Sequence, residues 1–203
     1  MGTALLVIDM QNDFCSPGGF YAARGRPTDW FPEVAAAIGR LAERFREAGD
    51  PVVYTRLVYP ADAPFPEERH AVAPARWTSY GERLRPGSWG AGIVEALVPA
   101  PGDVVVDKRH YSAFAGTDLA AQLAEREVDT VVITGVVAYA CVLHTAFDAF
   151  VHGLDVVVPA DAVDGWEPTL VDAARGIVEL LLGRTTTTEA LLAELASGTL
   201  APG

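Results

Sequence analysis

Short runs rich in β-branched residues alternate along this chain with stretches of helical periodicity, and this alternation is the feature that most limits the possible folds. The runs typical of strands are residues 4–9, 51–55, 103–107, 130–135, 154–159 and 184–187. Helical patterns occupy residues 31–48, 117–126, 141–152, 170–182 and 188–196. Strands that are apolar on both faces and alternate with helices are typical of a parallel sheet covered on both sides. We therefore predict a three-layer α/β/α fold with a doubly wound, mostly parallel sheet of about six strands.

One segment interrupts this alternation of strand and helix patterns. Residues 58–90 contain five prolines, together with Trp77, Tyr80 and Trp89. A long irregular segment inside a compact domain is usually functional. We expect a single domain over residues 1–203, in which residues 58–90 form a lid or a wall of the binding pocket.

Composition excludes several classes of partner. The formal net charge of −12 disfavours nucleic acid and anionic membrane surfaces. No run of eighteen apolar residues is present, and the first residues lack the pattern of a signal peptide. Only two cysteines occur, Cys15 and Cys141, which fits a reducing compartment. We expect a cytoplasmic protein that acts on a small molecule.

Three reactive groups follow strands of the predicted sheet. Asp9 ends the first strand, Lys108 follows the third, and Cys141 follows the fourth at the start of a helix. Carboxyl ends of parallel strands meet at one edge, where ligands bind. The helix N-terminus and a nearby ammonium would lower the pKa of the Cys141 thiol, and Asp9 would shuttle its proton. Taken singly, Cys141 also fits a buried apolar side chain, Asp9 a turn residue and Lys108 a surface charge.

Three longer motifs support the catalytic interpretation. The segments ALLVIDMQNDF (4–14), VVDKRHYSAFAGTDL (105–119) and TVVITGVVAYACVLHTAFDAF (130–150) resemble the isochorismatase-like cysteine hydrolase superfamily. The resemblance implies a catalytic triad of Asp9, Lys108 and Cys141. It also implies a cis peptide between Val136 and Val137, with an oxyanion hole formed by the N–H groups of Val137 and Cys141.

The resemblance implies hydrolysis of a small amide, ureido or lactam C–N bond through a thioester, with release of ammonia or an amine. Ureidoacrylate, N-carbamoylsarcosine and biuret hydrolases are the most similar branch. Two alternatives stay open: vinyl ether hydrolysis of the isochorismatase type, and a non-catalytic binding protein of the same fold. Members of this family commonly form homodimers or homotetramers, which we expect here as well.

The chain departs from the metal-binding nicotinamidases of this family. They place an aspartate and several histidines after the second strand, where this chain has Thr55-Arg56-Leu57. The four histidines of the chain (His70, His110, His144 and His152) show no ligand spacing after that strand. We therefore predict no catalytic metal and no cofactor.

Four residues are candidates for substrate binding. Phe14 matches an aromatic residue that often lines the pocket in this family, although core packing is an equal possibility. Arg56 would pair with a substrate carboxylate, unless it forms a structural or surface ion pair instead. Trp77 would cover a small ligand from the irregular segment. Tyr139 follows Val137 and Ala138, where many relatives have Ala-Thr, so we expect a more apolar pocket floor.

Overall fold

The structure, a computed structural model, describes residues 2–60 and 83–200. Trp77 and most of the expected lid segment lie outside these residues. The sheet has seven parallel strands, in the order β3-β2-β1-β4-β5-β7, with β6 paired to β4. The strands are β1 (Gly2–Ile8), β2 (Val52–Leu57), β3 (Val104–Lys108), β4 (Val128–Val136), β5 (Asp155–Pro159), β6 (Val163–Asp164) and β7 (Arg184–Thr186).

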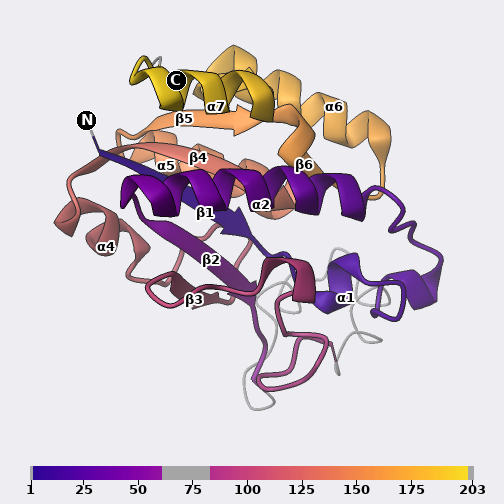
Figure 1. The fold of residues 1–203 in the computed structure, drawn as a ribbon. Helices are drawn as coiled ribbons and strands as arrows, with labels where there is room; N and C mark the ends of the chain where they lie inside the picture. Colours follow the sequence, from indigo (N-terminus) through magenta and orange to yellow (C-terminus); the bar gives the residue numbers. More distant parts are fainter. Residues whose placement is uncertain (1, 61–82, 201–203) are drawn as a thin grey trace.

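Helices cover both faces of the sheet (Figure 1). On one face α2 (Phe31–Ala48) and α7 (Thr188–Ser197) pack against alternate side chains of the central strands. On the other face lie α4 (Leu119–Glu125), α5 (Leu143–Val151) and α6 (Pro168–Ile177). The predicted three-layer, doubly wound fold is confirmed. The sheet has one strand more than expected, because the two-residue β6 is too short to produce an apolar run.

Shorter helices connect these elements. They are α1 (Asn12–Cys15), the 3₁₀ turns η1 (Ala22–Arg24), η4 (Glu95–Leu97) and η6 (Ala160–Ala162), and the π-helices η5 (Ala138–Val142) and η7 (Val178–Leu182). Within residues 2–60 and 83–200, none of the helices combines the length and apolar character that crossing a bilayer requires.

The order of the strands determines where a ligand can bind. From β1 the chain winds outward through β2 to β3, and from β4 it winds the other way through β5 to β7. The direction therefore reverses between β1 and β4, which are neighbours in the sheet. In open α/β sheets, ligands bind beyond the carboxyl ends of the strands at such a reversal. Asp9 follows β1 at this edge, and the cis peptide described below follows β4.

The two central strands approach each other most closely at Gly135. This residue pairs with Ile8 and has a φ of 102°. A Cβ atom added there would lie 2.1 Å from the carbonyl oxygen of Ile8. The end of β4 can therefore lie beside the end of β1 only if position 135 is glycine.

We expect Gly135→Ala to lower the free energy of unfolding by about 3 kcal/mol, because it adds both a backbone clash and an unfavourable φ. In a chain of this size, the thermal midpoint would fall by roughly 6–12 °C. Gly39→Ala is the matched control, since Gly39 lies inside α2 with nothing within 4 Å of the added atom. That variant should gain roughly 0.5–1 kcal/mol. Equal midpoints for the two variants would contradict the predicted clash.

Candidate active site

Asp9 lies directly after β1 in a conformation that few residues adopt. Its φ is 49°, in the left-handed region that aspartate tolerates better than most side chains. The side chain is fully buried. The Thr55 hydroxyl donates to Asp9 Oδ1 at 2.7 Å and accepts from the Asp9 backbone N–H at 3.1 Å. This pair of hydrogen bonds fixes the orientation of the carboxylate.

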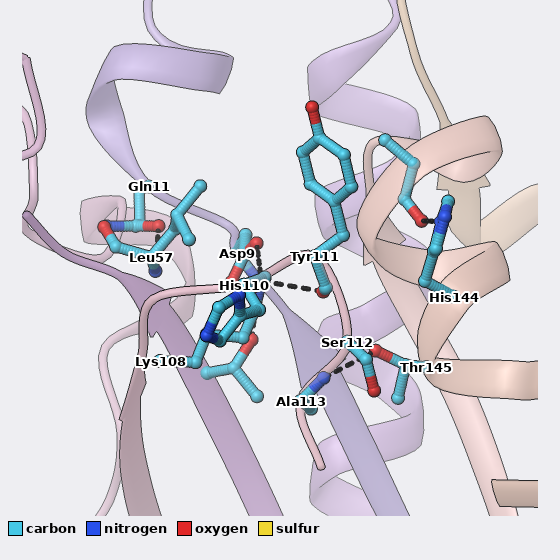
Figure 2. A network of polar contacts seen from close by, with 12 residues as sticks. Asp9, Gln11, Leu57, Lys108, His110, Tyr111, Ser112, Ala113, His144 and Thr145 are labelled. Carbon is cyan, nitrogen blue, oxygen red and sulfur yellow. Dashed lines mark hydrogen bonds and ion pairs between the residues drawn. The ribbon is translucent and has the colours of Figure 1, made fainter. Parts of the chain in front are cut away.

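Lys108, the last residue of β3, forms a buried ion pair with Asp9 (Figure 2). Its Nζ lies 2.7 Å from Asp9 Oδ2, and neither side chain has exposed area. The ammonium also donates to the carbonyl oxygens of His110 and Tyr111, each at 2.9 Å. Burial alone would lower the pKa of Lys108, but the charge of Asp9, the neighbouring Cys141 and the hydrogen bonds to both together outweigh it, and the net pKa is raised. Lys108 is therefore charged at neutral pH.

The reach of Lys108 depends on the strand between it and Asp9. β2 lies between β3 and β1, so the side chains of Lys108 and Asp9 together bridge two strand spacings, roughly 10 Å. Thr55 of β2 lies on this path, and its hydroxyl binds the carboxylate that Lys108 pairs with. Thr55 was not among the predicted site residues. Its only signal in the sequence is its position near the end of the second strand.

Cys141 lies in η5, between β4 and α5. Its side chain is buried, and its thiol is near enough to Asp9 and Lys108 to be influenced by their charges and hydrogen bonds. Burial raises the pKa of the Cys141 thiol well above its ordinary value, and the Lys108 ammonium only partly opposes this. The expectation of a lowered thiol pKa was wrong, because desolvation outweighs the favourable charge. The resting thiol is protonated and needs a base.

The backbone around Cys141 has two unusual features. The peptide between Val136 and Val137 is cis, as expected. The Val137 carbonyl accepts from the N–H groups of Ala140 at 2.9 Å and Val142 at 3.3 Å, and not from the N–H of Cys141 between them. Such π-turns occur often at functional sites. The oxyanion hole formed by the N–H groups of Val137 and Cys141 stays a prediction.

The candidate substrate-binding residues occupy different environments. Phe14 is buried, with its ring centroid 5.2 Å from that of Tyr21 and 6.1 Å from that of Trp166. Tyr139, in η5 beside Cys141, is half-buried. Burial raises its pKa, and the nearby Trp166 backbone opposes this shift. Phe14 and Tyr139 therefore both neighbour Trp166, a residue that was not predicted to belong to the site.

Arg56 has a different partner from the one proposed. Its guanidinium donates to the carboxylate of Asp107 through two hydrogen bonds, at 2.7 and 2.9 Å. Side chains alternate between the faces of a strand, so Arg56 points away from the face that carries Thr55. The structure therefore does not bring Arg56 to the triad.

Polar residues after β1 hold the surrounding loops in place. Gln11 is fully buried; its amide donates to the carbonyls of Leu57 and Ala91, and its Oε1 accepts from the Leu57 N–H. The Asp13 carboxylate accepts from the N–H groups of Phe20 and Leu84. A run of polar residues after a strand usually indicates an exposed loop, so this buried role could not be predicted from the amino-acid pattern.

The described parts of the chain contain no group of three or more histidine, cysteine, aspartate or glutamate side chains placed to hold a metal ion. The absence of a catalytic metal stays a prediction, because residues 61–82 fall outside the structure.

Comparison with known proteins gives consistent matches over almost the whole chain. The family model described as the isochorismatase domain matches residues 3–190. A ureidoacrylate amidohydrolase from Methylobacterium radiotolerans is 34% identical over 192 residues, covering 89% of this chain and 74% of that protein. An N-carbamoylsarcosine amidase from Arthrobacter is 31% identical over 176 residues, covering 83% of this chain and 61% of that protein. The solved structure of an isochorismatase family protein from Desulfovibrio vulgaris superimposes with a TM-score of 0.81 at 31% identity, covering 96% of this chain and 98% of that one.

Proposed function

Because this chain belongs to the isochorismatase family, we propose that it is a hydrolase in which Cys141 attacks the carbonyl of a small amide, ureido or lactam substrate. One observation carries the proposal: a fully buried ion pair, Lys108 to Asp9 at 2.7 Å, lies beside a buried thiol at the carboxyl edge of the sheet. The amidohydrolase and amidase names of two relatives support a C–N bond as the target.

The first half-reaction follows from the protonation states. The thiol is protonated and the Asp9 carboxylate is held beside the Lys108 ammonium. As the Cys141 sulfur bonds to the substrate carbonyl carbon, Asp9 accepts the thiol proton. The carbonyl oxygen becomes an oxyanion, which the N–H groups of Val137 and Cys141 stabilise. The C–N bond then breaks, the leaving nitrogen takes the proton from Asp9, and a thioester remains.

The second half-reaction uses the same groups in reverse. Water attacks the thioester carbon while Asp9 accepts a proton from it. The C–S bond breaks, the acid product leaves, and the proton on Asp9 returns to the thiolate. Lys108 stays charged throughout, because its three N–H groups are directed to Asp9, His110 and Tyr111. Its role is to hold the carboxylate and to stabilise negative charge on sulfur.

Thr55→Val tests the orientation of the base. Valine matches the shape of threonine but removes the hydrogen bond to Asp9 Oδ1. We expect kcat to fall about tenfold, because the carboxylate loses a charge-assisted hydrogen bond that orients it. The control is Thr134→Val, another fully buried threonine whose hydroxyl donates to the Leu6 carbonyl at 3.0 Å. It should lower stability by about 1 kcal/mol and leave kcat unchanged. Equal kcat losses in both variants would show that Thr55 acts only through packing.

The reaction class is tested with a panel of substrates. Ammonia release should be measured for ureido acids, N-carbamoyl amino acids and simple amides, and ring opening to the amino acid should be measured for lactams. In parallel, intact-mass measurement after brief mixing should detect an acyl group on Cys141 with any active substrate. Pyruvate release from isochorismate, without ammonia release from any panel member, would replace the proposal with vinyl ether hydrolysis. No turnover and no acyl adduct with any compound would favour a binding protein.

A further inference from the structure

We propose that Trp166 determines substrate specificity: its indole N–H donates a hydrogen bond to an acceptor on the part of the substrate beyond the scissile carbonyl. This inference rests on the proposed function and names a substrate class for it. The class is small amides and ureido compounds that carry a carboxylate or carboxamide a few bonds from the reacting carbon.

The fold places the segment that carries Trp166 beside Val137, the proposed oxyanion residue. It follows β6, which pairs with Gly135 and Val136 at the end of β4. A Cβ atom added to the preceding residue, Gly165, would lie 2.8 Å from Val137 Cγ1 and 3.1 Å from Tyr139 Cε1. The segment that carries Trp166 is thus packed against the oxyanion residue and its neighbour. A bulkier residue at position 165 would therefore require Val137, Tyr139 or the segment that carries Trp166 to shift.

The indole N–H of Trp166 is buried and has no hydrogen-bond partner in the part of the chain that the structure describes. Buried donors are nearly always paired in folded proteins, so an exception needs an explanation. Trp30 shows the ordinary case, since its indole N–H donates to the Pro27 carbonyl at 2.9 Å. An unpaired donor on a segment packed against the proposed oxyanion residue, Val137, is explained if a bound substrate supplies the acceptor.

Aromatic packing holds the indole ring in position. Its centroid lies 4.2 Å from that of Tyr21, in a stacked arrangement, and Phe14 stacks on Tyr21 at 5.2 Å. The ring therefore has little freedom to turn its N–H toward another partner. The donor is already oriented before the substrate binds, which reduces the entropy lost on binding.

The charges beside the ring do not substitute for the indole donor. The Arg26 guanidinium lies 5.9 Å from the centroid of the Trp166 ring, but it pairs with the carboxylate of Glu167. The positive charge of Arg26 is thus neutralised by Glu167. The Trp166 N–H can then recognise an acceptor on the substrate, and it can donate to either a carboxylate or a neutral carbonyl oxygen.

The test uses binding, so that it does not depend on turnover. The parent is the full chain with Cys141→Ala, titrated calorimetrically with 3-ureidopropionate, 3-ureidopropionamide and propylurea, which differ only in the terminal group. Trp166→Phe in this background keeps an aromatic ring and removes the N–H. We expect it to weaken binding of the two acceptor-bearing ureas about tenfold and to change propylurea binding less than twofold. Trp30→Phe is the matched control and should leave the binding of all three ureas unchanged.

Two results would overturn the inference. One is an equal loss of affinity for all three ureas in the Trp166→Phe variant, because Trp166 would then act by shape alone. The other is a parent affinity for propylurea that equals or exceeds its affinities for the two acceptor-bearing ureas. Thermal unfolding of the Trp166→Phe variant separates a folding defect from a specificity effect, and its midpoint should not fall by more than a few degrees. Both results leave the reaction at Cys141 open, since ammonia release and acylation of the thiol test that independently.

Discussion

Replacing Cys141 with alanine is expected to reduce turnover by about 10⁴-fold or more while leaving the fold intact. The loss is large because the sulfur forms the bond to the substrate, and neither Asp9 nor Lys108 can replace a missing nucleophile. The fold should survive because the side chain is small and α5 packs through other residues such as Ala146 and Ala149. Ammonia release under saturating substrate, with thermal unfolding in parallel, measures both effects.

The second cysteine provides the control for this experiment. Cys15 is also fully buried, and burial raises the pKa of its thiol as well, but it packs in the core on the α2 side of the sheet. Cys15→Ala should retain kcat within about twofold and lose roughly 1 kcal/mol of stability through the lost packing. If Cys141→Ala retained near-normal ammonia release, the proposed mechanism would be wrong whatever the control shows.

Breaking the Asp9–Lys108 pair is expected to have the largest effect on stability. Asp9→Asn or Lys108→Met leaves one uncompensated charge in a site without solvent, which costs about 3–5 kcal/mol. The double variant has no buried charge, so it should recover most of that loss. All three variants should have negligible activity, because the base or its positioning partner is gone. Chemical denaturation and ammonia release test the two expectations separately.

An exposed ion pair serves as the reference for this cycle. Arg40 and Glu189 lie 2.6 Å apart, but both side chains are largely exposed to solvent. Arg40→Met should change stability by roughly 0.5 kcal/mol or less. The stability losses of the two single variants at Asp9 and Lys108 could instead add in the double variant. In that case the two charges would not stabilise one another, and the proposed buried ion pair would be wrong.

The features that could be predicted from the sequence are those with a periodic pattern or a family motif. Runs of β-branched residues predicted six of the seven strands, and the doubly wound fold is confirmed. The motifs around Asp9, Lys108 and Cys141 predicted the place of the cis peptide, which is also confirmed. The roles of the three residues stay predictions, although the structure brings them together at one edge of the sheet.

The missed features depend on contacts between distant segments. Thr55 orients Asp9 across 46 positions of the chain, and nothing near Thr55 in the sequence indicates this contact. The raised pKa of the Cys141 thiol reflects the depth of burial, which only the packed structure reveals. Trp166 reaches the site because a two-residue strand, β6, pairs with the end of β4. Propensity and periodicity carry no information about such a short strand.

The ion pair between Arg56 and Asp107 has a consequence for how this protein behaves at high concentration. β3 ends the sheet among the described residues, and the strand is rich in valine, with Val105 partly exposed. An edge strand can offer unpaired backbone groups to a second chain and so promote aggregation. Extending the sheet from one molecule to the next would have to desolvate the charges that Arg56 and Asp107 place at its border. A residue considered for substrate recognition thus helps to keep the folded chains apart.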